Sequence, residues 1–186
     1  YATGKVTGEG NCTGGLVGLA DGSTIENSYA TGKVTGEEDY GDLRYTGGLV
    51  GYANGSTIEN SYATGSVSDG DYYTGGLVGG AYYSDIENSY ATGEVTGTTY
   101  TGGLVGWADY KSTITNSYAT GSVSGGYYST GGLVGKASDS TEITNSYATG
   151  KVTGKNYTGG LVGHAYNLTT ITNSYATGSV TGSDYT

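Results

Sequence analysis

One pentapeptide, Gly-Gly-Leu-Val-Gly, occurs six times in this chain of 186 residues. Successive copies are separated by 33, 28, 27, 29 and 28 residues, and a second string, Tyr-Ala-Thr-Gly, occurs seven times with the same period. The repeating unit is therefore about 28 residues long, with a five-residue insertion in the second copy. Self-similarity at such a period is typical of solenoids and related arrays, so residues 1–186 are expected to form a single repeat domain.

Each unit favours strands over helices, because Gly, Thr, Val, Ile and Tyr dominate it. Three short strands are expected per unit, at residues 15–20, 24–30 and 33–35 of the first one. Three such strands cannot bury a face alone, whereas parallel stacking pairs each coil with the next. The sequence therefore predicts an all-β, parallel β-solenoid of six to seven coils; a propeller, whose blades are longer, is the main alternative.

Composition excludes several classes of protein. The net charge of −10 argues against nucleic-acid binding. A single cysteine and a single histidine exclude a disulfide framework and a multi-histidine metal centre within the chain. No apolar run is long enough to span a membrane, and no signal peptide is apparent. Because the chain starts at Tyr1 and neither end departs from the repeat, we expect an uncapped fragment of a longer solenoid or fibre.

The repeats serve as an internal alignment, in which constant positions are expected to face inward. Strict alternation along the second strand places Ile25, Asn27 and Tyr29 inside, and Val34 faces inward in the third strand. We therefore predict a buried asparagine ladder and a stacked tyrosine ladder along the axis. The asparagines are Asn27, Asn60, Asn88, Asn116, Asn145 and Asn173. The tyrosines are Tyr29, Tyr62, Tyr90, Tyr118, Tyr147 and Tyr175.

Alternation also predicts that the valine of each pentapeptide faces outward if the preceding leucine faces inward. The valines are Val17, Val50, Val78, Val105, Val134 and Val162. A continuous exposed apolar stripe marks a contact surface, so this column is a candidate lateral interface. The alternative is a bulge that buries leucine and valine together.

The recurring Gly-Leu-Val-Gly and Asn-Ser-Tyr-Ala-Thr-Gly strings resemble the GLUG repeat of bacterial surface proteins, and the resemblance covers essentially the whole chain. That family occurs in large secreted adhesin-like proteins and in the non-catalytic parts of immunoglobulin A peptidases. The resemblance implies a secreted, cell-surface β-solenoid without catalytic residues, and no His-Glu-x-x-His motif occurs.

No catalytic set, and no cofactor, is expected. His164 lies in a column that varies between coils and is therefore interpreted as a surface histidine. Asp69 and Asp71 offer paired carboxylates, but the bases of a polysaccharide lyase are lacking beside them. The only metal candidate is a Ca²⁺ site in the insertion, for which a solvated acidic loop is the alternative. Its residues are Glu37, Glu38, Asp39 and Asp42.

Two kinds of modification are considered. Cys12 stands in a column otherwise made mostly of tyrosine, so we interpret it as a small apolar substitute, with linkage between chains as the alternative. Four Asn-x-Ser/Thr sequons are expected in loops, where glycans could attach. Their asparagines are Asn11, Asn54, Asn156 and Asn167.

The favoured function is that of an extracellular stalk or fibre that associates with itself, laterally or head to tail. Residues 1–94 carry a net charge of −10 (13 acids, 3 bases) and residues 95–186 are neutral (4 and 4), which favours polar stacking. The alternative is a binding module. Outward aromatic residues would bind surface glycans, whereas Thr-x-Thr rows would bind ice, although acidic residues interrupt those rows. The aromatic residues are Trp107, Tyr52, Tyr82 and Tyr83; the threonines are Thr113, Thr115, Thr170 and Thr172.

Overall fold

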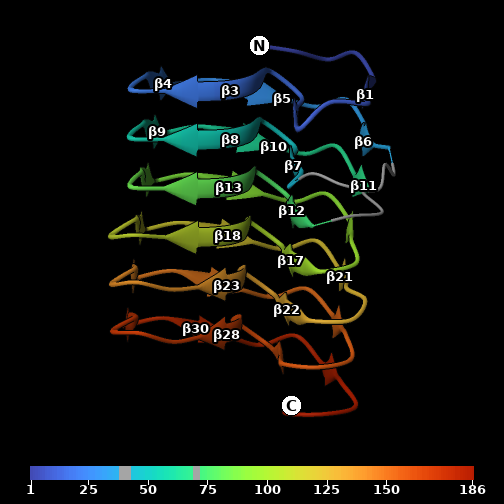
Figure 1. The fold of residues 1–186 in the computed structure, drawn as a ribbon, viewed down its shortest axis with the longest axis vertical. Coiled ribbons are helices and arrows are strands. Elements are labelled where there is room, and N and C mark those ends of the chain that lie inside the picture. The colour runs from blue at the N-terminus through green and yellow to red at the C-terminus, as the bar shows by residue number, and fades with distance from the viewer. Residues whose placement is uncertain (38–42, 69–71) are drawn as a thin grey trace.

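The computed structural model describes residues 1–37, 43–68 and 72–186. In this part of the chain every regular element is a β-strand, and the strands wind into a parallel β-solenoid of about six coils (Figure 1). The fold predicted from the 28-residue period is therefore confirmed. Each strand pairs in register with its counterpart one repeat away, so that Ile86 lies between Ile58 and Ile114.

Each complete coil contains five short strands, not the three that the sequence predicts. One additional strand arises because the constant asparagine divides the expected strand at residues 24–30 into two, and the other because residues 12–14, where no strand was predicted, also pair between coils. The strands form five parallel sheets that run the length of the rod.

Sheet 1 comprises β1 (Val6–Gly8), β6 (Val34–Gly36), β11 (Val67–Ser68), β16 (Val95–Thr96), β21 (Val123–Ser124), β26 (Val152–Thr153) and β31 (Val180–Thr181). Sheet 2 comprises β2 (Cys12–Gly14), β7 (Tyr45–Gly47), β12 (Tyr73–Gly75), β17 (Tyr100–Gly102), β22 (Ser129–Gly131) and β27 (Thr158–Gly159). Sheet 3 comprises β3 (Val17–Asp21), β8 (Val50–Asn54), β13 (Val78–Tyr82), β18 (Val105–Asp109), β23 (Val134–Ala137) and β28 (Val162–Ala165). Sheet 4 comprises β4 (Thr24–Glu26), β9 (Thr57–Glu59), β14 (Asp85–Glu87), β19 (Thr113–Thr115), β24 (Glu142–Thr144) and β29 (Thr170–Thr172). Sheet 5 comprises β5 (Tyr29–Ala30), β10 (Tyr62–Ala63), β15 (Tyr90–Ala91), β20 (Tyr118–Ala119), β25 (Tyr147–Ala148) and β30 (Tyr175–Ala176).

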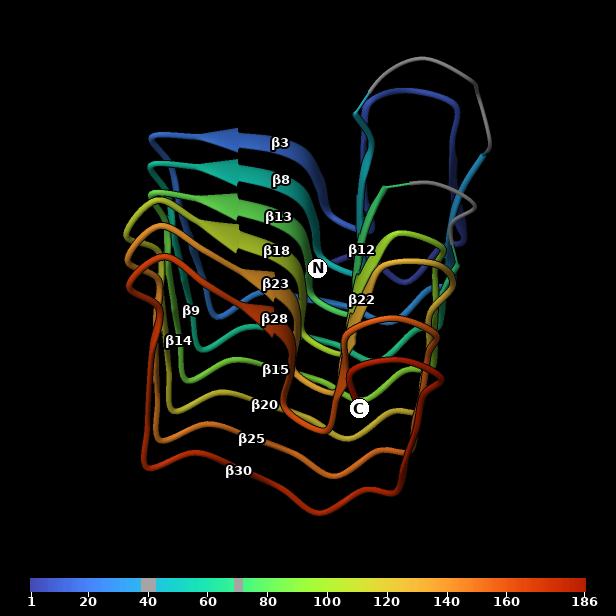
Figure 2. The same cartoon turned by 60° about the horizontal axis from the view of Figure 1, so that its bottom comes forward.

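The cross-section has two lobes joined at a narrow waist (Figure 2). Between sheets 2 and 3 the chain dips inward until its glycines meet the alanines of sheet 5. A Cβ on Gly103 would lie only 2.9 Å from the Cβ of Ala119, so no larger residue fits there. The larger lobe contains the main apolar core of Leu, Val, Ile and Ala, whereas the smaller lobe holds a valine column that includes Val34 and Val67.

Leucine and valine of the pentapeptide both face the core, so the predicted exposed valine stripe is wrong. Val50, Val78, Val105 and Val134 are fully buried, and Val17 and Val162 in the end coils pack against the same core. The cause is a bulge at the bend before sheet 3. The amides of Leu104 and Val105 both donate to the carbonyl oxygen of Leu133, at 2.9 and 3.0 Å. Two residues therefore oppose one, which breaks the alternation.

The constant asparagines are exposed corner residues, so the predicted buried asparagine ladder is also wrong. All six, Asn27, Asn60, Asn88, Asn116, Asn145 and Asn173, have positive φ angles of 48–51°. Asparagine tolerates this left-handed conformation, which turns the chain between sheets 4 and 5 and reverses the alternation.

The buried polar ladder is formed instead by the serine that follows each asparagine. The Ser117 hydroxyl donates to the carbonyl oxygen of Thr115 at 2.8 Å and accepts from the amide of Ser89 at 3.1 Å. The same pair of bonds recurs along the column, so each serine closes its own corner and joins it to the next coil.

The predicted tyrosine stack exists, but it lies on the outer side of sheet 5. Successive rings are 4.9–5.2 Å apart, with interplanar angles of 2–6°. The alternation reversed at the asparagine corner turns the alanine after each tyrosine inward, and Ala30, Ala63, Ala91, Ala119 and Ala148 are buried. Each ring is therefore covered by its neighbours above and below rather than by the core.

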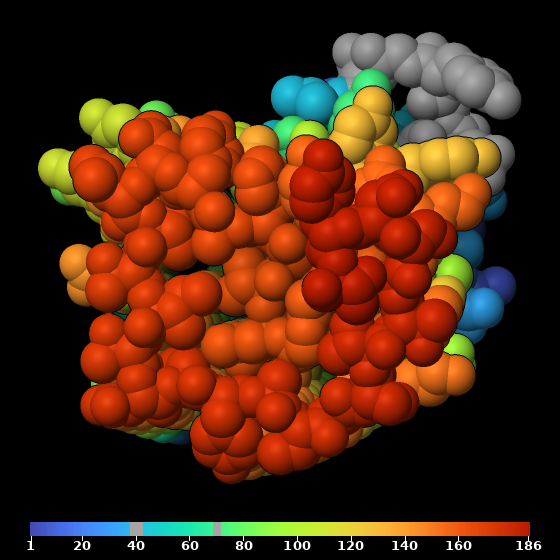
Figure 3. Space-filling view, turned by 90° about the horizontal axis from the view of Figure 1, so that it is seen from below, coloured from blue at the N-terminus to red at the C-terminus, as the bar shows by residue number. Residues whose placement is uncertain are grey.

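The end coil exposes groups that are buried in the middle of the rod. Figure 3 shows this surface from below, formed by the last coil. Ile171 is 44% exposed, whereas Ile143, one coil earlier, is fully buried. In the described residues no helix has the length and apolar character to cross a membrane.

Candidate binding groove

The inward dip between sheets 2 and 3 recurs from coil to coil, and we call the resulting furrow in the backbone the groove, although aromatic side chains fill much of it (Figure 2). Its floor is made of glycines, because the two sheets approach too closely for side chains there. A Cβ on Gly106 would lie 2.7 Å from the amide nitrogen of Thr74, and one on Gly75 would be 2.7 Å from the amide nitrogen of Gly106. The pentapeptide thus builds the groove in each coil, while the columns beside it supply the walls.

Aromatic side chains line the middle of the groove. From sheet 2, Tyr73 stacks between Tyr45 and Tyr100, with ring centroids 4.8 and 5.2 Å away. From sheet 3, Trp107 lies 4.9 Å from Tyr73, and Tyr52 lies 4.4 Å from Tyr45. We name these five residues the aromatic cluster. Trp107 and Tyr52 were predicted outward-facing aromatic residues, and the structure places both in this cluster.

Gly80 makes room for the cluster. It lies in register between Tyr52 and Trp107, in the column that varies from coil to coil. A Cβ at Gly80 would collide with the ring of Tyr45 and would lie 3.1 Å from the Tyr52 ring. Gly80 could not be singled out from the sequence, because its contact partner Tyr45 is 35 residues away.

A chain of hydrogen bonds orients the indole. Nε1 of Trp107 donates to the hydroxyl of Ser138 at 3.3 Å, and this hydroxyl donates to Oδ1 of Asp109 at 2.6 Å. Asp109 is buried, and the loss of solvation raises the pKa of its carboxyl group despite the bond from Ser138. Trp107 is therefore held at a fixed angle in the wall of the groove.

Burial also suppresses ionisation of the tyrosines. Loss of solvation, followed by the proximity of Tyr100, raises the pKa of Tyr73 to about 12. The pKa of Tyr45 is raised further for the same reasons, with Tyr73 as its main neighbour. The phenols of the cluster are therefore neutral over the physiological pH range and can both donate and accept hydrogen bonds.

One cationic side chain, Lys136, and the single histidine, His164, lie at the C-terminal end of the groove. The Lys136 ammonium is 5.2 Å from the ring centroid of Tyr100 and 5.3 Å from that of Tyr166. The imidazole of His164 stacks on Tyr157 at 4.7 Å and on Tyr166 at 5.3 Å. Burial, followed by the charge of Lys136, lowers the pKa of His164. The histidine is thus half-buried between aromatic rings rather than a free surface residue.

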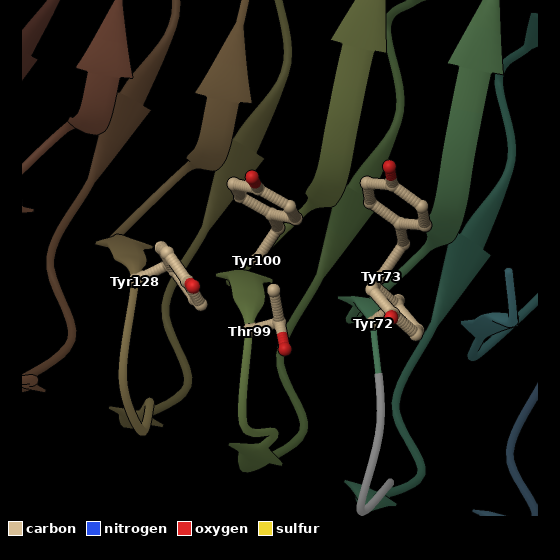
Figure 4. Close-up of a pocket in the computed structure, with 5 residues that line it drawn as sticks. All are labelled: Tyr72, Tyr73, Thr99, Tyr100 and Tyr128. Carbon is tan, nitrogen blue, oxygen red and sulfur yellow. The ribbon is translucent and has the colours of Figure 1, made fainter. Parts of the chain in front are cut away.

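A pocket of about 400 Å³ opens beside the aromatic cluster (Figure 4). It is lined by Tyr72, Tyr73, Thr99, Tyr100 and Tyr128. Tyr72 and Tyr128 lie on either side of Thr99, with the rings of Tyr73 and Tyr100 next to them. Its lining is uncharged and combines aromatic surface with five hydroxyl groups.

Other predicted site residues fall elsewhere. Cys12 pairs in register with Tyr45 at the start of sheet 2 and is a free, half-buried thiol whose pKa is raised by burial. Of the Ca²⁺ candidates, Glu37 is exposed and its carbonyl oxygen accepts a hydrogen bond from Arg44. The others, Glu38, Asp39 and Asp42, lie outside the described residues, as do Asp69 and Asp71. Within residues 1–37, 43–68 and 72–186 no three His, Cys, Asp or Glu side chains are grouped to hold a metal ion.

The sequence predicts that all four sequons lie in loops, but only two of them do. Asn11 and Asn167 do, but Asn54 ends β8 and Asn156 forms an isolated bridge with Asp184. At both asparagines the backbone pairs with an adjacent coil, Asn54 with Tyr82 and Asn156 with Asp184. The Thr-x-Thr rows lie in sheet 4, where register pairing places Asp85 and Glu142 between threonines of adjacent coils. These acidic residues interrupt the rows, which argues against an ordered ice-binding plane.

The fold and the groove define a β-solenoid repeat protein with an aromatic groove, and its repeats identify the family. The GLUG motif matches residues 9–35, 42–68, 70–96, 97–124, 126–153 and 154–181. The chain therefore belongs to the GLUG motif family. Searches of curated proteins and of solved structures found no match.

Proposed function

We propose that this chain is a structural segment of an extracellular, cell-surface adhesin-like protein, where it acts as a stiff spacer or stalk. The observation that carries the proposal is the continuity of the five parallel sheets, which join every coil to the next. The same positions pair in each coil, and both lobes are filled by side chains. Such a rod lengthens by adding repeats without any change in its cross-section.

Membership in the GLUG motif family supports a structural role, because the repeat itself accounts for most of the chain. We assign no catalytic role to this segment. Its single histidine, His164, stacks on two tyrosine rings. In this arrangement the imidazole packs on aromatic rings rather than facing a nucleophilic side chain.

The extracellular location is tested on intact cells of the source organism. An antibody against this segment should label intact cells, and external protease should remove the label while a cytoplasmic marker survives. Labelling only after the cells are lysed would overturn the location. The stalk is tested separately by small-angle X-ray scattering of the purified chain, which should fit a rod of constant cross-section. A flexible-chain profile would overturn the mechanical role even if the location holds.

We also propose that the isolated segment associates head to tail. The last coil exposes Ile171 and open strand edges, which are the groups that a further coil would cover. The acidic first half and the neutral second half make polar stacking electrostatically better than stacking of two acidic ends. Sedimentation velocity of the purified chain should show growth of the assembly with increasing protein concentration. A monomer at all concentrations would refute this association.

A further inference from the structure

The pocket beside the aromatic cluster arises from a gap in one column of residues. This column precedes sheet 2 and holds Asn11, Arg44, Tyr72, Thr99, Tyr128 and Asn156 in successive coils. Thr99 therefore separates two tyrosines that are two coils apart, or roughly 10 Å from two steps of ~4.8 Å. A small residue between two large ones opens a slot that a ring at position 99 would fill.

The fold does not require tyrosine at positions 72 and 128. Tyr72 is 41% exposed and Tyr128 is 54% exposed, and other coils carry asparagine, arginine or threonine in the same column. Core packing therefore does not explain these two rings. Large exposed aromatic side chains that gather beside a cavity mark binding surfaces.

The back of the pocket is rigid before any ligand binds. Tyr73 is only 8% exposed and is fixed by stacking on Tyr45, Tyr100 and Trp107. Tyr72 packs against Tyr73 at 6.1 Å with its plane tilted by 35°. Tyr128 packs against Tyr100 at 6.0 Å with a tilt of 31°. A ligand held by such preorganised rings loses little of its binding free energy to ordering the protein.

The chemistry of the lining suits a ligand with an apolar face and a hydroxylated rim. Four tyrosines and Thr99 supply aromatic faces together with hydroxyl groups that donate and accept hydrogen bonds. At about 400 Å³ the pocket lies at the small end of ligand sites, which range over roughly 300–1,000 Å³. A single sugar ring combines these properties.

We propose that the pocket between Tyr72 and Tyr128 binds one pyranose residue of a neutral glycan. The tyrosine rings pack on the apolar face of the sugar, and the hydroxyl of Thr99 bonds to its rim. The competing ligand is a quaternary ammonium group, which aromatic cages also hold. Lys136 opposes that ligand, because its ammonium already lies 5.2 Å from the ring centroid of Tyr100 and would repel a second cation.

The pocket is tested with the purified chain and a panel of small probes. These are the methyl glycosides of glucose, galactose, mannose and N-acetylglucosamine, with tetramethylammonium as the competing probe. Saturation-transfer NMR detects weak binding, and the fluorescence of the single tryptophan, which contacts Tyr73, reports on the same wall. We expect at least one glycoside to bind with a dissociation constant on the order of 1 mM, because the open pocket covers only part of the sugar.

Three variants connect this binding to the pocket. Tyr72→Ala and Tyr128→Ala should each weaken binding roughly tenfold, the loss expected for one aromatic contact. Thr99→Tyr should abolish it by filling the slot with a side chain that neighbouring coils already carry. The matched control is Tyr110→Asn, which removes an exposed tyrosine outside the pocket at a positive φ that asparagine tolerates. Circular dichroism and melting confirm that each variant is folded.

The proposal concerns the pocket alone and stands whether or not the segment is extracellular. Binding that is retained in Tyr110→Asn and lost in folded Thr99→Tyr supports it. Failure of every glycoside to bind the unmodified chain overturns it, as does undiminished binding in folded Thr99→Tyr. Binding of tetramethylammonium without any glycoside, lost in the same variants, would identify a cation cage and also overturn it.

Discussion

Replacement of Ser117 by alanine tests the serine ladder directly. The change removes the hydroxyl that accepts from the buried amide of Ser89, at 3.1 Å, and that donates to the carbonyl oxygen of Thr115. That carbonyl keeps a second bond, from the amide of Asn88 at 3.1 Å, whereas the Ser89 amide loses the acceptor that the hydroxyl provides. One orphaned buried donor costs about 1–3 kcal/mol. For a chain of this length, each kcal/mol of lost stability lowers the melting temperature by about 2–4 °C. The melting temperature should therefore fall by about 2–12 °C.

The neighbouring asparagine provides the contrast. Asn116→Gly keeps a residue that accepts the φ of 50° and should change stability by no more than about 0.5 kcal/mol. The matched control, Ser122→Ala, removes an exposed hydroxyl from the residue that precedes β21 and should have no effect. Chemical denaturation followed by circular dichroism measures all three. If Asn116→Gly destabilised the chain while Ser117→Ala did not, the asparagine would be the buried ladder after all.

Three further perturbations follow from the structure. Thr101 has a buried hydroxyl without a hydrogen-bond partner among the described residues. Thr101→Val should therefore stabilise the chain by about 1 kcal/mol, as measured by urea denaturation. Destabilisation would indicate that the hydroxyl does make a hydrogen bond. Gly80→Ala should displace the Tyr45 ring and change the emission of the single tryptophan; an unchanged spectrum would contradict the crowding. The pKa of Tyr73 is raised from 10.0 to about 12, so its folded form holds a proton that the unfolded chain loses. Its contribution to stability is therefore complete below pH 10 and disappears as the pH rises to about 12, which alkaline unfolding monitored by tyrosinate absorbance measures.

The period, the parallel register and much of the core could be predicted from the sequence, because they depend on repetition alone. A column that is isoleucine in every coil must stack on itself, and Ile58, Ile86, Ile114 and Ile143 are fully buried. Parallel pairing at a fixed period then follows for every other column. These properties need no knowledge of the local bends.

The predicted inward or outward orientation of side chains was wrong where the backbone departs from extended geometry. Strict alternation assumes one residue per step, but Val105 shares its acceptor with Leu104, and Asn116 turns the chain at a φ of 50°. Each event reverses the alternation for the residues that follow. The rule that constant residues lie inside failed for the same reason, because Asn116 is constant in order to turn a corner. The serine beside it then takes the buried polar position.

In the groove, the residues that the fold requires are different from the residues that line the candidate site. Glycines are required at the waist and the floor because backbone and Ala119 lie where side chains would be, so the pentapeptide must recur in each coil. Three columns beside it are free to vary: one holds Gly80 and Trp107, one holds Tyr73 and Ser129, and one holds Tyr72 and Thr99. Where these columns hold neighbouring aromatic residues, the groove acquires a preorganised wall, and where one holds Thr99 it acquires a pocket. On the sugar-binding proposal, substitutions in these columns would change the ligand of a GLUG rod without disturbing the ladders that hold its coils together.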